Sequence, residues 1–254
     1  MIFITALRKE ILELARTYRL LVAAIVLIFF GLTSPLMAKY MREFIGILPN
    51  TGGIDLTSII PPPTTMDAVT QYIKNMSQFG IFLALLFGMG SVAQEKERGT
   101  AAMMLVKPMP RSMFILAKFA GLALLFAATL LVAGLACYYY TYLLFEALDV
   151  GAWLALNGLL LLQILVYVAA TILCSTLLRT QIAAGGAAFG FMLVLAIFGA
   201  IPGWAKYFPG ELTNWGMRLM AGDLQASWTA LTIAVLIIVV SLAAAILAFR
   251  KQEL

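Results

Sequence analysis

Six long apolar runs dominate this sequence and leave room for few other folds. Hydrophobic residues make up 63% of the 254 residues, and the mean hydropathy is +1.00. A soluble domain has roughly 45 to 50% apolar residues, and a helix needs about 20 of them in a row to cross a hydrocarbon core of about 30 Å. The runs lie at residues 20–38, 77–93, 114–145, 153–178, 182–201 and 228–249. We therefore predict an all-α, polytopic membrane protein, with one transmembrane domain over residues 1–254.

The number of crossings depends on two of these runs. The runs lack the strict alternation of apolar and polar residues that marks a membrane β-barrel. The second run is short, but five apolar residues recur at helical spacing before it: Met66, Val69, Tyr72, Ile73 and Met76. This periodicity predicts a helix that leads directly into the second crossing. The third run is long enough to be divided, which would give seven crossings instead of six.

Basic residues are distributed unevenly between the connections. In a six-helix layout, twelve of the seventeen Lys and Arg residues lie on the side that holds both chain ends. The other five lie on the opposite side: Lys39, Arg42, Lys74, Lys206 and Arg218. Because cytoplasmic loops carry the excess of positive charge, both termini are expected in the cytoplasm. Seven crossings would move Arg250 and Lys251 outside, so six fit better.

Two segments beside the runs have patterns of their own. Residues 1–19 place five apolar side chains on one helical stripe: Phe3, Leu7, Ile11, Leu14 and Tyr18. This stripe predicts an interfacial helix, although the segment could serve only as an orientation signal. Residues 202–227 mix proline, glycine and apolar residues, which predicts broken, re-entrant-like helices before the last crossing. The alternative there is a loop on the membrane surface.

Charge is concentrated at residues 94–111, between the second and third runs. A glycine and two prolines interrupt this segment, so we predict a short helix held in a rigid elbow. Such an elbow can transmit a push that a loose loop would absorb, and the alternative is an ordinary charged loop. The residues expected to act in the elbow are Glu95, Glu97, Arg98, Gly99, Thr100, Met103, Met104, Leu105, Pro108 and Arg111.

Several kinds of chemistry are missing from the sequence. It has no histidine, the commonest metal ligand and proton shuttle, and no phosphate-binding Gly-x-x-x-x-Gly-Lys-Ser/Thr loop. Charges buried in the runs would mark functional sites, but Lys118, Glu146 and Asp149 are expected to reach water. Cys137 and Cys174 are expected to pack as small apolar residues, too far apart for a disulfide. We expect no catalytic residue and no bound metal or cofactor.

The elbow carries a family resemblance. The sequence Glu95-x-Glu97-Arg98-Gly99-Thr100, followed by an apolar turn, Pro108, Arg111 and Lys118, resembles the coupling segment of type-2 ABC transporter permeases. It is similar to the permeases grouped with copper-enzyme maturation transporters. The resemblance implies a non-catalytic membrane subunit that pairs with a second permease copy and binds two ABC ATPase subunits. ATP and Mg would then bind in those partners.

The resemblance also implies a setting and a path. The subunit would sit among lipids in the cytoplasmic membrane of a prokaryote, and the net charge of +5 reflects topology rather than a nucleic-acid partner. The first, second and fifth helices would line the path between two permeases. The candidate pivot or contact positions are Gly31, Ser34, Pro35, Gly88, Gly90, Gly186 and Gly190. Gly186 and Gly190 form a small-xxx-small pair, which could equally pack within one chain.

Three functions remain open at this stage. The first is export of a substrate such as a peptide, a drug or a lipid-like molecule. The second is a mechanical role, in which the permease relays ATP-driven motion to an extracytoplasmic partner that handles metal or protein maturation. The third is a membrane enzyme or scaffold without any ATPase.

Overall fold

Helices make up nearly all of the regular structure in this chain. The computed structural model describes residues 2–47, 61–97, 99 and 110–252, and no strand occurs among them. Six described helices are long and apolar enough to cross a membrane. They are α2 (Arg19–Ile47), α4 (Thr65–Met89), α7 (Arg111–Leu144), α8 (Val150–Leu177), α9 (Gln181–Gly199) and α11 (Trp228–Lys251). The prediction of an all-α membrane protein with six crossings is confirmed.

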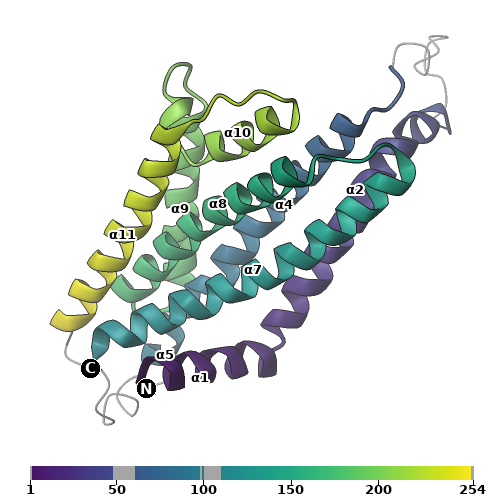
Figure 1. Cartoon of the computed structure of the whole chain (residues 1–254). Coiled ribbons are helices and arrows are strands. Elements are labelled where there is room, and N and C mark those ends of the chain that lie inside the picture. Colours follow the sequence, from purple (N-terminus) through teal and green to yellow (C-terminus); the bar gives the residue numbers. More distant parts are fainter. Residues whose placement is uncertain (1, 48–60, 98, 100–109, 253–254) are drawn as a thin grey trace.

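Both chain ends lie at the same end of the helix bundle, here called the terminal end (Figure 1). The first helix, α1 (Ile2–Arg16), lies across this end at a steep angle to α2. The turn between α1 and α2 holds Tyr18 at a φ of 60°, a conformation that interrupts a right-handed helix. The helix predicted for residues 1–19 is therefore present and separate from the first crossing.

The second crossing starts earlier than its apolar run. Three prolines at residues 61–63 precede α4, and Thr64 then forms a capping box with Asp67. The Thr64 backbone N–H donates to Asp67 Oδ2 over 2.8 Å, which satisfies one of the free donors at a helix start. The prediction that a helix before residue 77 leads into the second crossing is thus confirmed.

The second crossing is interrupted by a turn before the elbow. It ends at Met89, and a turn over residues 90–92 separates it from the short helix α5 (Ala93–Glu97). Ser175 of α8 holds this break. Its hydroxyl donates to the Met89 carbonyl over 2.8 Å and accepts from the N–H groups of Val92 and Ala93 over 3.0 and 2.9 Å. A distant side chain therefore replaces hydrogen bonds that a continuous helix would make.

Close approaches between helices hold the bundle together. An ideal Cβ built on Gly31 of α2 would lie 2.6 Å from the Ala133 carbonyl oxygen of α7, so the two backbones nearly touch. Small residues permit such contacts between membrane helices. The last four predicted runs differ from the observed helices by no more than three residues at either end. Of the described residues of α9, only Ala184 and Ala188 are buried, so this helix lies at the edge of the bundle.

The end opposite the termini carries two short helices, η1 (Ala205–Tyr207) and α10 (Gly210–Met220). These are the broken helices predicted before the last crossing. The α10 helix packs against α8, and a Cβ on Gly216 would approach the Leu156 side chain to 3.2 Å. Glu211 accepts from Arg218 over 2.8 Å and from Ser227 over 3.1 Å. These bonds fasten α10 to the start of α11.

Candidate functional site

The elbow is described only at its two flanks. On the first flank, Glu95 and Glu97 belong to α5, and Gly99 follows with a φ of 68°, a backbone conformation that favours glycine. On the second flank, Arg111 begins α7. The other predicted elbow residues lie outside the described residues: Arg98, Thr100, Met103, Met104, Leu105 and Pro108. The geometry of the site is therefore that of the helices from which the elbow leaves and to which it returns.

The first flank is fastened by a buried lysine. Lys118 of α7 has only 3% of its side chain exposed. Its Nζ donates to Glu95 Oε1 over 2.7 Å and to the two carboxylate oxygens of Glu10 over 3.3 and 3.4 Å. The ammonium also lies 4.9 Å from the centre of the Phe114 ring, within cation–π range. Three helices, α1, α5 and α7, meet at this one group.

The prediction that Lys118 reaches water was wrong. The helix α1 packs on α7 and brings Glu10 over the lysine. Glu10 is separated from Lys118 by 108 residues along the chain, so no local pattern revealed the partner. The two groups can stay buried because each is neutralised by an opposite charge.

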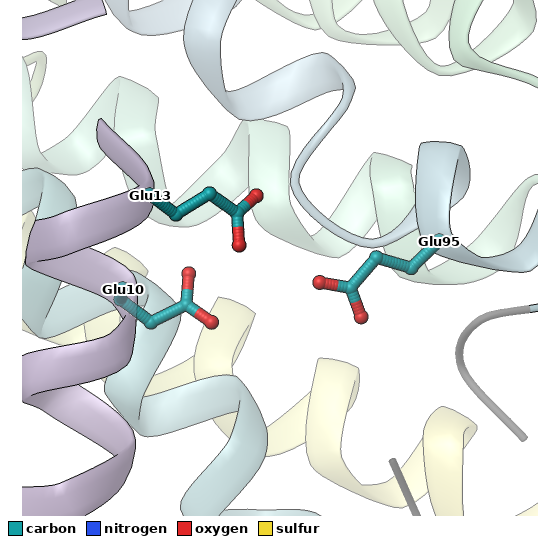
Figure 2. Close-up of side chains that lie close together, drawn as sticks. All are labelled: Glu10, Glu13 and Glu95. Carbon is teal, nitrogen blue, oxygen red and sulfur yellow. The ribbon is translucent and has the colours of Figure 1, made fainter. Parts of the chain in front are cut away.

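Three carboxylates lie together beside this lysine, and Figure 2 shows their side chains pointing towards one another. Glu10 and Glu13 extend from α1 towards Glu95 of α5, and their oxygens lie within 4.8 Å of one another. Such a group could hold a cation, but the chain itself supplies two. Besides Lys118, the Nζ of Lys9 lies 3.6 to 3.8 Å from all three carboxylates. The cluster is therefore an ion-pair network, which we call the Lys118 cluster.

The second flank is fastened by Arg111. Its Nη1 donates to the carbonyl oxygens of Phe249, Arg250 and Gln252, each over 3.0 Å. These carbonyls belong to the C-terminal end of α11, where backbone acceptors lack helical partners and a positive charge is favoured. The Phe114 ring also stacks on the Phe249 ring at 5.2 Å. Sequence reasoning had assigned Arg111 to ATPase coupling, and the structure shows it capping α11.

A third contact connects the two flanks. Lys96 of α5 donates through Nζ to the Thr176 carbonyl at the end of α8. The same carbonyl accepts from Gln252 Nε2 over 2.9 Å, and Gln252 in turn accepts from Arg111. The departure and the return of the elbow are thus tied to the ends of α8 and α11.

Comparison with known proteins identifies the family of this chain. The sequence model described as ABC-2 family transporter protein matches residues 4–254. The chain belongs to the ABC-2 transporter family. A relative, the uncharacterized transmembrane protein YxlG of Bacillus subtilis (strain 168), is 28% identical over 261 residues. That alignment covers 99% of this chain and 98% of the relative. This ABC-2 protein is therefore a multi-pass membrane permease, and subunits of this family are generally non-catalytic.

The predicted path residues of this ABC-2 permease lie in two groups. Gly31, Ser34 and Pro35 are on α2, where Gly31 abuts α7. The Ser34 hydroxyl donates to the Phe30 carbonyl over 2.5 Å and accepts from Asn75 of α4 over 2.9 Å. The first group thus forms contacts among α2, α4 and α7. Asn75 was missed because one amide in the amphipathic stretch before the second run gives no sign of its partner.

The second group lies along α4 and α9. A Cβ on Gly88 would come within 2.8 Å of the Thr171 side chain of α8, and one on Gly90 within 3.3 Å of Gln181. For Gly186 and Gly190 of α9, nothing in the described chain lies within 4 Å of such a Cβ. Beside them, α4 and α9 enclose an apolar groove of about 600 Å³, lined by Phe82, Met89, Gly185, Phe189 and Met192 among others.

Proposed function

We propose that this chain is the membrane-spanning subunit of an ATP-driven transporter. Residues 94–111 would face the cytoplasm and bind a separate ABC ATPase subunit, in which ATP and Mg are held. The excess of basic residues at the terminal end supports this orientation. Two permease copies, each with one ATPase, would form the transporter. The membership in the ABC-2 family and the missing phosphate loop support a non-catalytic role for this chain.

One observation carries the proposal: both flanks of the elbow are fastened to membrane helices. Glu95 and Lys96 attach the first flank to α7, α1 and the end of α8. Arg111 attaches the second flank to the end of α11. A force applied between residues 97 and 110 is therefore delivered to several crossing helices at once. These contacts are charge-assisted hydrogen bonds, which are stronger than neutral ones. They would therefore hold while the elbow moves, and the helices would follow it.

For the transported material we propose export along the faces of α2, α4 and α9. The apolar groove between α4 and α9 supports this path. No atom of the described residues lies within 4 Å of a Cβ built on Gly186 or Gly190, which leaves room there for a second copy or for a substrate. Gly31, Gly88 and Gly90 would then act at contacts that change during transport.

The mechanical alternative also has an observation in its favour. The helix α8 holds the elbow break through Ser175 at one end and packs against α10 near Leu156 at the other. Its 28 residues correspond to a rod about 42 Å long. Motion at the elbow could therefore reach α10 and a partner that binds there. An assay of solute transport separates this role from export.

The proposal is tested by replacing the two methionines at the centre of the elbow. We expect Met103→Asp with Met104→Asp to abolish copurification of an ATPase subunit in mild detergent, because a docked apolar surface would acquire two charges. The matched control is Met41→Asp, which alters an exposed methionine far along α2. Membrane insertion should be normal in both variants. Copurification that is unchanged in the elbow variant would contradict the proposal.

A further inference from the structure

The Lys118 cluster joins two helices that otherwise pack on different neighbours. The helix α1 packs on α7 and α2, whereas α5 packs on α9. Side chains connect the two: Lys118 donates to Glu10 of α1 and Glu95 of α5. Lys9 of α1 adds a longer contact of 3.8 Å to Glu95.

The chemistry of this junction favours a role in fixing the position of α5 relative to α1. An ammonium group has three hydrogens to donate, and Lys118, whose side chain is only 3% exposed, directs them at two carboxylates. Buried ion pairs often add little stability over a well-packed apolar group, but they demand one arrangement of their partners. The clearest use of such groups is to set the register between helices.

The exposed face of α1 indicates which surface this helix contacts. Ile4 and Leu12 have 70% and 47% of their surfaces exposed, and Arg8 and Arg16 are also exposed. Exposed apolar and basic residues on one helix are typical of helices that bind a membrane surface. The contacts that join Glu95 to α1 through Lys118 and Lys9 would then hold the start of the elbow at the level of that surface.

We propose that Lys118 is a positioning residue, which holds α5 against α1 and so sets where the elbow leaves the membrane. Its effect on ATP hydrolysis rests on the function proposed above, whereas the junction itself does not. In the assembled transporter, a load on the elbow would move α1, α5 and α7 as one unit. Without the cluster, α5 would move apart from α1.

The junction is tested on the permease alone by measuring the distance between α1 and α5. Spin labels at Arg8→Cys and Glu97→Cys, in a background with Cys137→Ala and Cys174→Ala, report it by pulsed electron resonance. We expect a single narrow distance in this parent. The neutral variant, with Lys118→Met, Glu10→Gln and Glu95→Gln, should lose it. Lys9→Met should keep it, since that side chain is 41% exposed and lies 3.6 to 3.8 Å from the carboxylates, farther than Lys118 does.

A charge-reversed variant separates position from simple packing. The combination Glu10→Lys, Glu95→Lys and Lys118→Glu, made together with Lys9→Met so that Lys9 does not face two new lysines, restores both ion pairs with opposite sign and should recover the narrow distance. Lys118→Glu alone places like charges together and should not. This pair of variants keeps the test decisive even when the neutral variant fails to fold. A narrow distance in the neutral variant, or no recovery on charge reversal, overturns the proposal.

The consequence for coupling is read in the complex with the ATPase. Lys118→Met with Glu10→Gln, which leaves the elbow residues unchanged, should copurify with the ATPase in the parent amount but lose the ATPase activity that depends on the permease. Full activity in that variant would overturn the coupling role. If no ATPase binds the parent, the proposed function fails, and the spin-label distances still decide whether Lys118 positions α5.

Discussion

The contact between α2 and α7 allows a test of whether Gly31 is chosen for close packing. We predict that Gly31→Ala destabilises the subunit, because the new Cβ would lie 2.6 Å from the Ala133 carbonyl oxygen and 3.2 Å from its Cα. Both atoms belong to the backbone, so no side-chain rotation can relieve the contact. The two helices must separate along this interface instead.

The expected magnitude follows from two opposing effects. Overpacking of a close contact costs about 1–3 kcal/mol, and backbone atoms place this case near the upper end. Alanine in place of glycine favours a helix by roughly 0.5–1 kcal/mol. The net loss should therefore be about 2–2.5 kcal/mol. For a protein of this size, each kcal/mol corresponds to roughly 2–4 °C in the melting temperature.

Gly190→Ala is the matched control for this substitution. Nothing in the described chain lies within 4 Å of a Cβ at Gly190, so this change should give only the gain in helix propensity. Thermal unfolding of both variants is measured on the monomeric fraction in one detergent. Equal melting temperatures for the two variants would refute the close contact between α2 and α7.

Two further predictions concern single polar groups. Ser175→Ala should leave the N–H groups of Val92 and Ala93 without their acceptor, at a cost of about 1–3 kcal/mol for a buried donor, and hydrogen exchange should accelerate there. Thr176→Val is the control, because among the described residues that hydroxyl donates to the Ile172 carbonyl of the same helix. Burial raises the pKa of Glu211, but its hydrogen bonds, chiefly from Arg218, lower it below the ordinary value of 4.5. Its ionised form therefore stabilises the fold above about pH 4.5, and this contribution is lost as the pH falls further. Glu211→Gln should flatten the acid side of the stability curve, and a slope equal to that of the parent would contradict this assignment.

The six crossings could be predicted because apolar length is a local property of the sequence. The early start of α4 was also readable, since Met66 and its neighbours keep helical spacing and Thr64 with Asp67 forms a local cap. The break before α5 was not readable. It depends on Ser175, which lies more than 80 residues further along the chain, and glycines in a membrane helix do not by themselves predict an interruption.

The location of the candidate site could be predicted from the sequence, but the tertiary contacts of its residues could not. Charge density marked residues 94–111, and the residues of its two flanks do lie at the terminal end. Lys118 was assigned to water because it lies near the end of an apolar run. Its burial requires α1 to fold back and supply Glu10, a tertiary event. Likewise, Arg111 carries no sequence signal for the α11 carbonyls that it caps.

The cap formed by Arg111 also has a consequence for the order of synthesis. The carbonyls that it binds belong to residues made 138 to 141 positions later. During translation, Arg111 therefore lacks these acceptors until α11 has left the ribosome and inserted into the membrane. The second flank of the elbow is completed only after α11 has been made. We expect nascent or truncated chains that end before α11 to be poor partners in assembly, which would protect the cell from half-made transporters.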